Sequence, residues 1–256
     1  MKRERIEAIF NSIDNLKKRV LDKDTREKQA ELFKLEISLM CLKSGFLNRR
    51  IQGIKELSNV TRSIRMYSHK NFKSSDLVQW IKENKVLDLV LDPKKTHIQL
   101  VQRISDILRL LAYEDQLGEE ELTMVWTLAC SSYKNEVYKA LNEISVHLKV
   151  EHAYFFFEKI TARNANEFRV EDFQCLSDLG KYSIDLEFKR KLVEFFLEII
   201  KRAENFKEEV QENAVAKFCE MIKLWDVENK KVFFGELIGN IKENKGSSLT
   251  CLIALK

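Results

Sequence analysis

Cysteine and histidine are the residue types in this chain whose side chains could perform covalent or metal chemistry. The five cysteines lie far apart, at Cys41, Cys130, Cys175, Cys219 and Cys251. A cysteine nucleophile needs a nearby histidine and a setting that lowers the pKa of its thiol, such as an exposed turn that opens a helix. None of these cysteines has that setting, and most lie in apolar helical patterns. We therefore expect reduced core thiols in an intracellular protein and no catalytic residue, although a pairing in space stays open.

The four histidines do not form a pattern that binds a metal ion. They are His69, His97, His147 and His152. The last two are five residues apart, so on one continuous helix they diverge, and the sequence has no CxxC, HExxH or aspartate-rich calcium loop. The glycines never cluster, which excludes the phosphate-binding loops. The acidic run at 119–121 fits the first turn of a helix. We expect no metal site and no cofactor.

Composition indicates that helices must position whatever site the chain carries. Of 256 residues, 45% are hydrophobic and 33% are charged, and the chain holds only seven glycines and one proline, Pro93. Strand-rich domains need turn residues about every 8–12 positions, which this chain does not supply. The apolar content is sufficient for a substantial core. These features predict an all-α protein.

Charge is nearly balanced along the chain. Lys and Arg total 44 against 40 Asp and Glu, and the two signs alternate in nearly every segment. This distribution argues against a dedicated nucleic-acid surface. The N-terminal stretch MKRERIEAIFNSIDNLKKRV is charged within every turn, and no run reaches about 18 apolar residues. We expect a cytosolic protein with no membrane partner.

Apolar residues recur with helical spacing from one end of the chain to the other. The expected helices cover residues 2–21, 25–43, 47–66, 74–91, 96–114, 118–131, 134–148, 151–161, 170–180, 185–204, 207–225 and 228–244. Asp76 and Asp185 lie near helix starts, where carboxylates accept hydrogen bonds from free backbone amides. Pro93 is expected to end one helix before the next begins.

A glycine inside the amphipathic helix expected at 47–66 points to a repeat. The segment NRRIQGIKEL at 48–57 matches NEVYKALNEI at 135–144, with Gly53 opposite Ala140. A glycine within a helix costs about 1 kcal/mol relative to alanine, so we expect another helix backbone to pack against Gly53. The match with Ala140 predicts that alanine at position 53 is tolerated and that leucine is not.

The repeat predicts the architecture. Each copy is a helical hairpin, and the best-marked copies cover residues 25–66, 74–114, 118–148 and 170–204. Their spacing is close to that of armadillo and HEAT units. We therefore expect one domain over residues 1–256, an armadillo/HEAT-like superhelical solenoid of stacked hairpins. The apolar run SLTCLIALK at 248–256 ends without a capping signal, as expected of a fragment of a larger chain.

Three stretches could contact a partner. The aromatic run at 154–157 cannot all face one stripe of a helix, so it indicates either a helix buried on several sides or an exposed anchor. The stretch 61–73 is locally basic and could contact phosphates. The polar sides of the second helices of the hairpins would line a concave face. The candidate partner-binding residues there are Arg49, Arg50, Gln52, Lys55, Arg103, Lys139 and Asn142.

Several of these segments together resemble a known family. They are KLEISLMCLKSGFLNRRIQGIKELSNV, WIKEN followed by an apolar helix and the residues HIQ at 97–99, and the spacing from these to Leu122, Trp126 and the helix at 135–148. Over roughly residues 27–180 the chain resembles the N-terminal helical region of the large fat-facets-type ubiquitin-specific proteases. The resemblance implies armadillo-like repeats far upstream of a peptidase domain. The cysteine box GLxNxGNTCYxN and the histidine box of that peptidase do not occur here.

The resemblance implies a function without catalysis in this segment. The leading hypothesis is a protein-interaction scaffold within a large deubiquitinating enzyme, a thiol protease whose active-site residues lie outside this sequence. Protein partners in the ubiquitin pathway follow from the resemblance alone. The alternatives are a free-standing helical-repeat adaptor unrelated to ubiquitin and a nucleic-acid-associated helical repeat.

Overall fold

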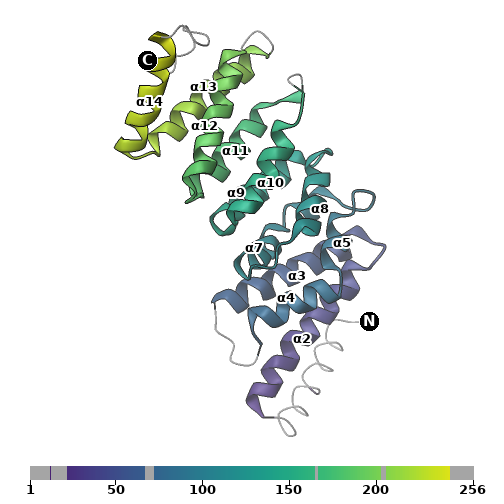
Figure 1. Ribbon diagram of the computed structural model, residues 1–256. Coiled ribbons are helices and arrows are strands. Elements are labelled where there is room, and N and C mark those ends of the chain that lie inside the picture. The colour runs from purple at the N-terminus through teal and green to yellow at the C-terminus, as the bar shows by residue number, and fades with distance from the viewer. Residues whose placement is uncertain (1–11, 13–21, 67–71, 165–166, 203–205, 243–256) are drawn as a thin grey trace. The chain divides into compact units, whose positions relative to one another are not determined.

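The computed structural model describes residue 12 and residues 22–66, 72–164, 167–202 and 206–242, and all regular elements in them are helices (Figure 1). The prediction of an all-α protein is therefore confirmed for these residues. The helices are α2 (Lys23–Leu42), α3 (Leu47–Met66), α4 (Ser74–Glu83), α5 (Val86–Leu91), α6 (Ile98–Val101), α7 (Ser105–Tyr113), α8 (Glu119–Ala129), α9 (Lys134–Ile144), the 3-10 turn η1 (Ser145–His147), α10 (Val150–Thr161), α11 (Val170–Tyr182), α12 (Leu186–Lys201), α13 (Glu208–Lys223) and α14 (Val227–Lys242). The helix expected at 2–21 lies outside the described residues, apart from Ser12.

The chain packs as two compact units, Met1–Ser131 and Ser132–Lys256. The boundary falls within the predicted repeat 118–148, between its first and second helices. Each unit buries its own apolar side chains, and the core residues of both are nearly inaccessible to solvent. Within the described residues, none of the helices has the length and apolarity needed to cross a bilayer.

Two of the long helices expected from the sequence are broken into shorter ones. The segment 74–91 divides into α4 and α5 because Lys85 has a φ of 48°, which lies outside the helical region. The segment 96–114 divides into α6 and α7, with a turn at 102–104. The apolar periodicity continues through the second break, so the pattern does not reveal it, whereas at the first break Ile81 and Val86 are five residues apart and the pattern shifts. Asp185 caps α12 as predicted and accepts a hydrogen bond from Phe188 N at 2.5 Å.

Helices α2 and α3 form a hairpin, and Gly53 lies where the two helices pack together. A Cβ at Gly53 would lie 2.7 Å from the backbone oxygen of Ser38 and 2.9 Å from Cys41 Cβ. The prediction that another helix backbone packs against Gly53 is therefore confirmed. The expected tolerance of alanine is wrong, because the atom in the way belongs to backbone and cannot rotate aside. Ala140 is also buried, but it belongs to the second unit and has its own neighbours.

Helix α3 organises the rest of the first unit. It packs against α4, α6 and α7 as well as α2, and α5 packs against α8. Its buried side includes Ile54, Leu57 and Val60, each at most 3% exposed. Burying a side chain of this size contributes about 1.5–3 kcal/mol relative to leaving it in water. This side is fully used by the core, so the opposite side of α3 faces solvent.

Helix α11 organises the second unit. It packs against α9, α10, α12 and α13, and α12 also packs against α13. Gly180 allows this close packing, because a Cβ there would lie 2.4 Å from Leu192 Cδ1 and 2.6 Å from Met221 Cε. The aromatic run of α10 contributes to the same core, with Phe156 fully buried and Tyr154 edge-on to Phe188 at 5.0 Å. The first of the two interpretations of that run, a helix buried on several sides, is thus supported.

Candidate functional site

The exposed side of α3 carries three of the predicted partner-binding residues. Arg49, Gln52 and Lys55 are all exposed and follow one another at three-residue intervals, which places them on one side of the helix. Arg49 lies over the ring of Phe46, with its guanidinium carbon 5.3 Å from the ring centroid. Gln52 donates a hydrogen bond to Glu56 at 2.6 Å. We call Arg49, Gln52, Lys55 and Glu56 the α3 surface. It offers mixed hydrogen-bonding groups and no catalytic arrangement.

Arg50, the fourth predicted residue on this helix, has a structural contact. Its guanidinium donates to the backbone oxygen of Leu89 at 2.6 Å and to that of Lys95. These two carbonyls lie on either side of Pro93, at the end of α5 and in the loop that follows. Arg50 therefore fastens this loop to α3 with charge-assisted hydrogen bonds. Its side chain is not available to a partner in this conformation.

Arg103 lies at the corner between α6 and α7 and is half-buried. Its guanidinium donates to the backbone oxygen of Gln99 at 2.8 Å, and its own backbone oxygen accepts from Ser58 Oγ at 3.2 Å. The second bond ties the corner to α3. Arg103 thus contributes to the packing of the first unit as much as to its surface.

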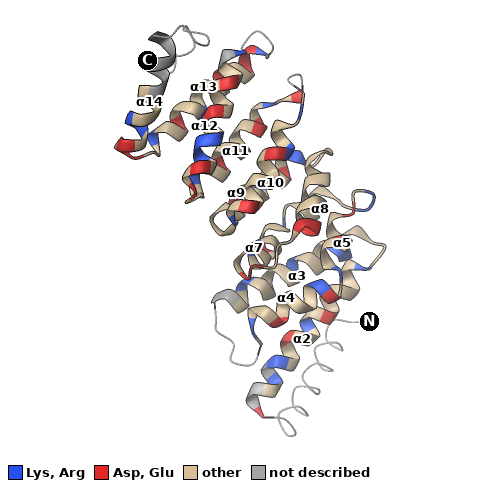
Figure 2. Ribbon diagram, in the orientation of Figure 1, with Lys and Arg blue, Asp and Glu red and all other residues tan. Residues whose placement is uncertain are grey.

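Lys139 and Asn142 lie on α9, in the second unit, and both are exposed. They are three residues apart and so share one side of that helix. The seven predicted residues therefore fall into one group in each unit. Figure 2 shows acidic and basic residues interspersed over the helices, in keeping with the balanced charge of the sequence.

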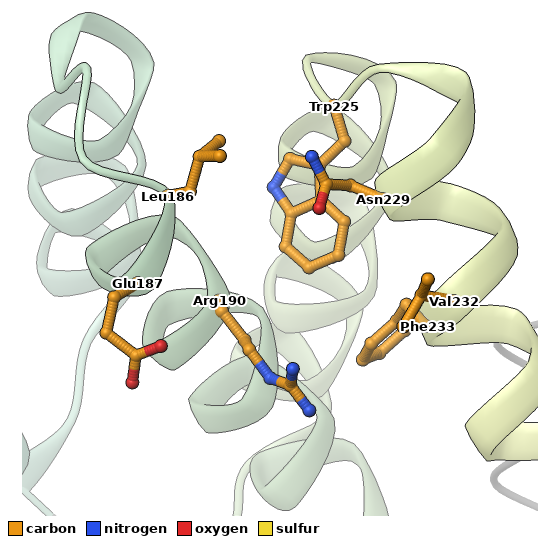
Figure 3. A pocket seen from close by; sticks show the side chains of 7 residues that line it. All are labelled: Leu186, Glu187, Arg190, Trp225, Asn229, Val232 and Phe233. Atoms are coloured by element: carbon orange, nitrogen blue, oxygen red, sulfur yellow. The ribbon is translucent and has the colours of Figure 1, made fainter.

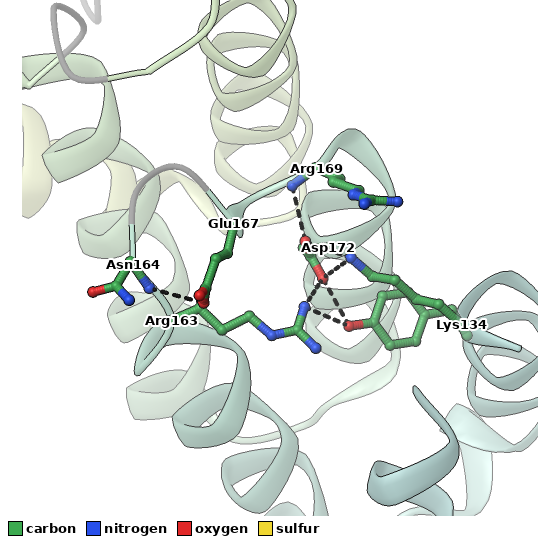
Figure 4. A network of polar contacts seen from close by, with 7 residues as sticks. Lys134, Arg163, Asn164, Glu167, Arg169 and Asp172 are labelled. Carbon is green, nitrogen blue, oxygen red and sulfur yellow. Dashed lines mark hydrogen bonds and ion pairs between the residues drawn. The ribbon is translucent and has the colours of Figure 1, made fainter. Parts of the chain in front are cut away.

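A buried ionic cluster in the second unit was not foreseen from the sequence (Figure 4). The carboxylate of Asp172 is fully inaccessible and accepts hydrogen bonds from Lys134 Nζ at 2.8 Å and from Arg163 at 2.7 Å. It also accepts from Tyr138 Oη at 2.7 Å and from Arg169 N at 2.9 Å. The one signal in the sequence is an aspartate in the first turn of a helix that is otherwise apolar on that side. The cluster joins α9, the end of α10 and the start of α11.

Burial changes the acidity of two groups near this cluster. Burial, with the neighbouring Cys175 thiol and the negative charge of Asp172, raises the pKa of Tyr138 far above its ordinary value of 10.0. Burial, with the charges of Asp178 and Asp172, likewise raises the pKa of the Cys175 thiol above its ordinary value of 9.0. Both groups stay protonated at neutral pH. A thiol in this state is the opposite of an activated nucleophile.

The other cysteines correct one expectation. Cys175 is buried, but Cys130 and Cys219 are exposed and Cys41 is half-buried, so the prediction of core thiols holds for one of these four. Cys130 is the C-cap residue of α8, and Cys219 lies within α13 next to the buried Phe218. Cys251 lies outside the described residues, as does His69.

Two histidines and the acidic run cap helices or lie in the packed interior. His97 caps the short helix α6, and its Nδ1 accepts from Gln99 N at 3.3 Å. His147 lies in η1 and His152 is buried in α10, so they do not share a helix. Among the described residues, no three His, Cys, Asp or Glu side chains gather as a metal site would require. The acidic run at 119–121 forms the first turn of α8 as predicted, and Glu121 accepts from Gly118 N at 2.8 Å.

Comparison with known proteins shows which proteins this chain is similar to. Three relatives are ubiquitin carboxyl-terminal hydrolases. Ubiquitin carboxyl-terminal hydrolase 9X of Mus musculus is 27% identical over 137 residues, which is 50% of this chain and 5% of the relative. The probable ubiquitin carboxyl-terminal hydrolase FAF of Drosophila melanogaster is 25% identical over 135 residues, 47% of this chain and 5% of the relative. Ubiquitin carboxyl-terminal hydrolase 24 of Homo sapiens is 32% identical over 97 residues, 37% of this chain and 4% of the relative.

The matched regions are thus about a twentieth of the length of these relatives, and about a third to a half of this chain. A family of armadillo (ARM) repeats, described as the UBP24/USP9X/USP9Y ARM repeat, matches a longer part, residues 28–256. That range contains every helix from α3 to α14 and most of α2. The sequence resemblance is confirmed and extends beyond residue 180. The chain belongs to the ARM repeat family of UBP24, USP9X and USP9Y.

Proposed function

We propose that this chain is a protein-interaction region, without catalytic activity of its own, of a large ubiquitin-specific protease. Its family membership over residues 28–256 and the names of its relatives support the link to deubiquitination. The same evidence favours this function over a free-standing adaptor unrelated to ubiquitin. Because the matched regions are a small share of those relatives, any cleavage of ubiquitin would belong to other parts of the full protein.

The observation that carries the proposal is the division of α3 into a core side and a solvent side. The core side holds Gly53, Ile54 and Leu57, which pack within the unit, while Arg49 and Lys55 remain exposed on the other side. Repeat proteins of this kind bind partners on the extended concave surfaces that their stacked helices form. The α3 surface, with both donors and acceptors, suits a polar protein partner.

The basic stretch at 61–73 gives less support to a nucleic-acid function. Arg62 forms a salt bridge with the buried carboxylate of Asp106 at 2.6 Å, which offsets its charge. Residues 67–71 lie outside the described residues. Among the side chains of this stretch that the structure describes, Arg62 is paired and Lys73 is exposed, which is a weak footprint for a phosphate backbone that proteins contact through several cations at once.

Charge reversal on the α3 surface tests the proposal. The 256-residue chain is immobilised, and the proteins that it retains from a cell extract are quantified by mass spectrometry. The double variant Arg49→Glu with Lys55→Glu should lose at least one retained protein about tenfold or more, since reversing a charge that faces a complementary partner places like charges together, which costs several kcal/mol. The matched control is Lys43→Glu with Lys94→Glu, which makes the same change of charge at two other exposed positions of the first unit.

Two results would contradict the proposal. One is that the double variant and its control retain the same proteins in equal amounts, because the α3 surface would then bind nothing specific. The other is turnover of a fluorogenic ubiquitin amide by the purified chain that is lost when a cysteine is replaced by serine. The chain would then be catalytic, and a scaffold role would no longer describe it.

A further inference from the structure

A pocket in the second unit lies between the first turns of α12 and the junction of α13 with α14 (Figure 3). Its volume is about 180 Å³. Leu186, Glu187 and Arg190 of α12 line one side, and Trp225, Asn229 and Val232 line the other. An apolar cavity of about 150 Å³ accommodates a benzene molecule, so this pocket has room for one large apolar side chain.

Trp225 gives the pocket an unfulfilled hydrogen-bond donor. Its side chain is only 9% exposed, and its indole Nε1 is buried with no acceptor among the described residues. The indole of Trp80 is different, because its Nε1 donates to Glu36 Oε1 at 3.2 Å. A buried donor without an acceptor costs about 1–3 kcal/mol, and buried tryptophans usually have one. An acceptor that reached Trp225 from the pocket would remove this cost.

Leu186 lies opposite that donor. In Figure 3 the nitrogen of the Trp225 ring is on the edge that faces Leu186 across the pocket. The leucine is 56% exposed, so its side chain can change rotamer without disturbing the core. Such a change would open the edge of the indole to an incoming group.

The other polar groups at the pocket match a peptide rather than an anion. Arg190, whose Nε bonds to Glu194 at 2.9 Å, adds a cation, and Glu187 adds a carboxylate. The amide nitrogen of Asn229 donates to Asp226 at 2.7 Å, which leaves its oxygen as an acceptor at the pocket (Figure 3). The lining therefore holds donors and acceptors and charges of both signs. A peptide group offers one acceptor and one donor, whereas a phosphate offers only acceptors and would be repelled by Glu187.

The rim of the pocket is apolar and exposed. Leu186 and Val232, which line the pocket, are 56% and 50% exposed, and Ile184 and Val227, near Leu186 and Trp225 in the sequence but outside the lining, are 96% and 67% exposed. A cluster of exposed apolar side chains around a pocket is typical of a site that anchors a partner. The rim would cover the apolar stem of an inserted side chain and exclude water from the hydrogen bond to Trp225.

We propose that this pocket binds a short, uncharged segment of a partner protein. The segment inserts one leucine, methionine or phenylalanine side chain, and a backbone carbonyl next to that residue accepts the hydrogen bond from Trp225 Nε1. Because Arg190 is already paired with Glu194, the carboxylate of Glu187 is the uncompensated charge at the pocket, and it selects against acidic segments. This proposal rests on the proposed function, since it names the kind of segment that an interaction region would recognise.

Nuclear magnetic resonance can observe the donor directly. The chain has three tryptophans, so its indole N–H region contains three signals, and the signal that Trp225→Phe removes belongs to Trp225. The probes are end-blocked heptapeptides Gly-Ser-Ser-X-Ser-Ser-Gly, in which X is leucine, methionine, phenylalanine or alanine. At millimolar concentrations the three large residues should move the Trp225 signal downfield, as a new hydrogen bond does. The alanine peptide should not, and the signal of Trp80, which already has an acceptor, should stay in place.

Affinity measurements with the leucine peptide complete the test. Trp225→Phe keeps the ring and removes the donor, so it should weaken binding about fivefold to tenfold, the equivalent of one hydrogen bond. Val232→Asp should abolish binding, because it puts a charge on the apolar rim. Leu224→Ser is the control, since Leu224 is 46% exposed but does not line the pocket, and it should leave the affinity unchanged.

Three outcomes would overturn the proposal. They are the absence of any shift of the Trp225 signal with all four peptides, equal binding by Trp225→Phe, and a Trp225 signal that moves with the concentration of the chain alone. The last would mean that a second copy of this chain occupies the pocket. The α3 surface lies in the first unit and is tested with other variants. A negative result in the peptide titration would therefore leave the proposed function standing. A negative result in the retention assay would not prevent the measurement of peptide binding at the pocket.

Discussion

Replacing Gly53 by alanine tests the contact on which the first hairpin depends. Without a side chain, Gly53 allows the backbone of α2 to approach α3. An added Cβ would lie 2.7 Å from the backbone oxygen of Ser38 and 3.0 Å from the backbone nitrogen of Leu42. Ordinary contacts of a Cβ begin at about 3.4 Å, so α2 and α3 would have to move apart by several tenths of an ångström along their interface.

Two opposite contributions determine the magnitude. Overpacking of a well-packed contact typically costs about 1–3 kcal/mol, while exchanging glycine for alanine within a helix gains up to about 1 kcal/mol. We therefore expect Gly53→Ala to lower the free energy of unfolding of the first unit by about 1 kcal/mol. Gly53→Leu should lower it by more than about 3 kcal/mol, because its larger side chain has no space at all.

The assay is urea denaturation followed by tryptophan fluorescence in a Trp225→Phe background, so that Trp80 and Trp126 report the first unit alone. The control is Gly235→Ala in α14, where an added Cβ would meet nothing within 4 Å. Circular dichroism should show that variant to be as stable as the unmodified chain or slightly more stable, since only helix propensity changes. A Gly53→Ala protein at least as stable as the unmodified chain would refute the close approach of α2 and α3.

The remaining predictions concern the Asp172 cluster, Arg50 and the cysteines. Asp172→Ala should destabilise the second unit by about 3–5 kcal/mol in urea denaturation, because it leaves two cations that are only 14% and 15% exposed without their carboxylate, and a loss below about 1 kcal/mol would contradict the cluster. Arg50→Ala should cost the first unit about 1–3 kcal/mol by thermal melting, because two carbonyls lose their charged donor, whereas Arg49→Ala should change the melting temperature little. Iodoacetamide should label Cys130 in the folded protein and Cys175 only after unfolding. The pKa of the Cys175 thiol is raised in the folded state, so above pH 9.0 the thiol ionises in the unfolded chain but not in the folded one. Urea denaturation should therefore show that the second unit loses stability as the pH rises above 9.0.

The sequence was sufficient to predict helices and the residues of the hairpin, for reasons visible in the structure. The spacing of Ile54 and Leu57 identifies the buried side of α3, because helical period and burial are directly linked. The break at Lys85 was missed because neither proline nor glycine marks the position, and the five-residue step from Ile81 to Val86 is only a small shift of the apolar period. Tertiary contacts, and not local propensity, determine that break.

The candidate site was predicted less well, because exposure on a helix does not reveal what a long side chain reaches. Arg49 and Arg50 are adjacent and chemically identical, yet one is exposed and the other donates to carbonyls 39 and 45 residues away in the sequence. The Asp172 cluster and the donor of Trp225 are of the same kind, since both depend on residues that meet only in the folded chain. A single sequence does not contain these distances.

The close packing of α11 also affects how the second unit opens to solvent. Because Gly180 lets Leu192 and Met221 contact α11 directly, neither α12 nor α13 can detach without uncovering the central helix. The backbone amides of α11 should therefore exchange with deuterium only when the whole unit opens, while those of α14 exchange through smaller, local openings. Amide exchange in the second unit should therefore be slowest in α11. A partner bound at the pocket beside α14 would slow amide exchange in α14, the part of the unit that opens most readily.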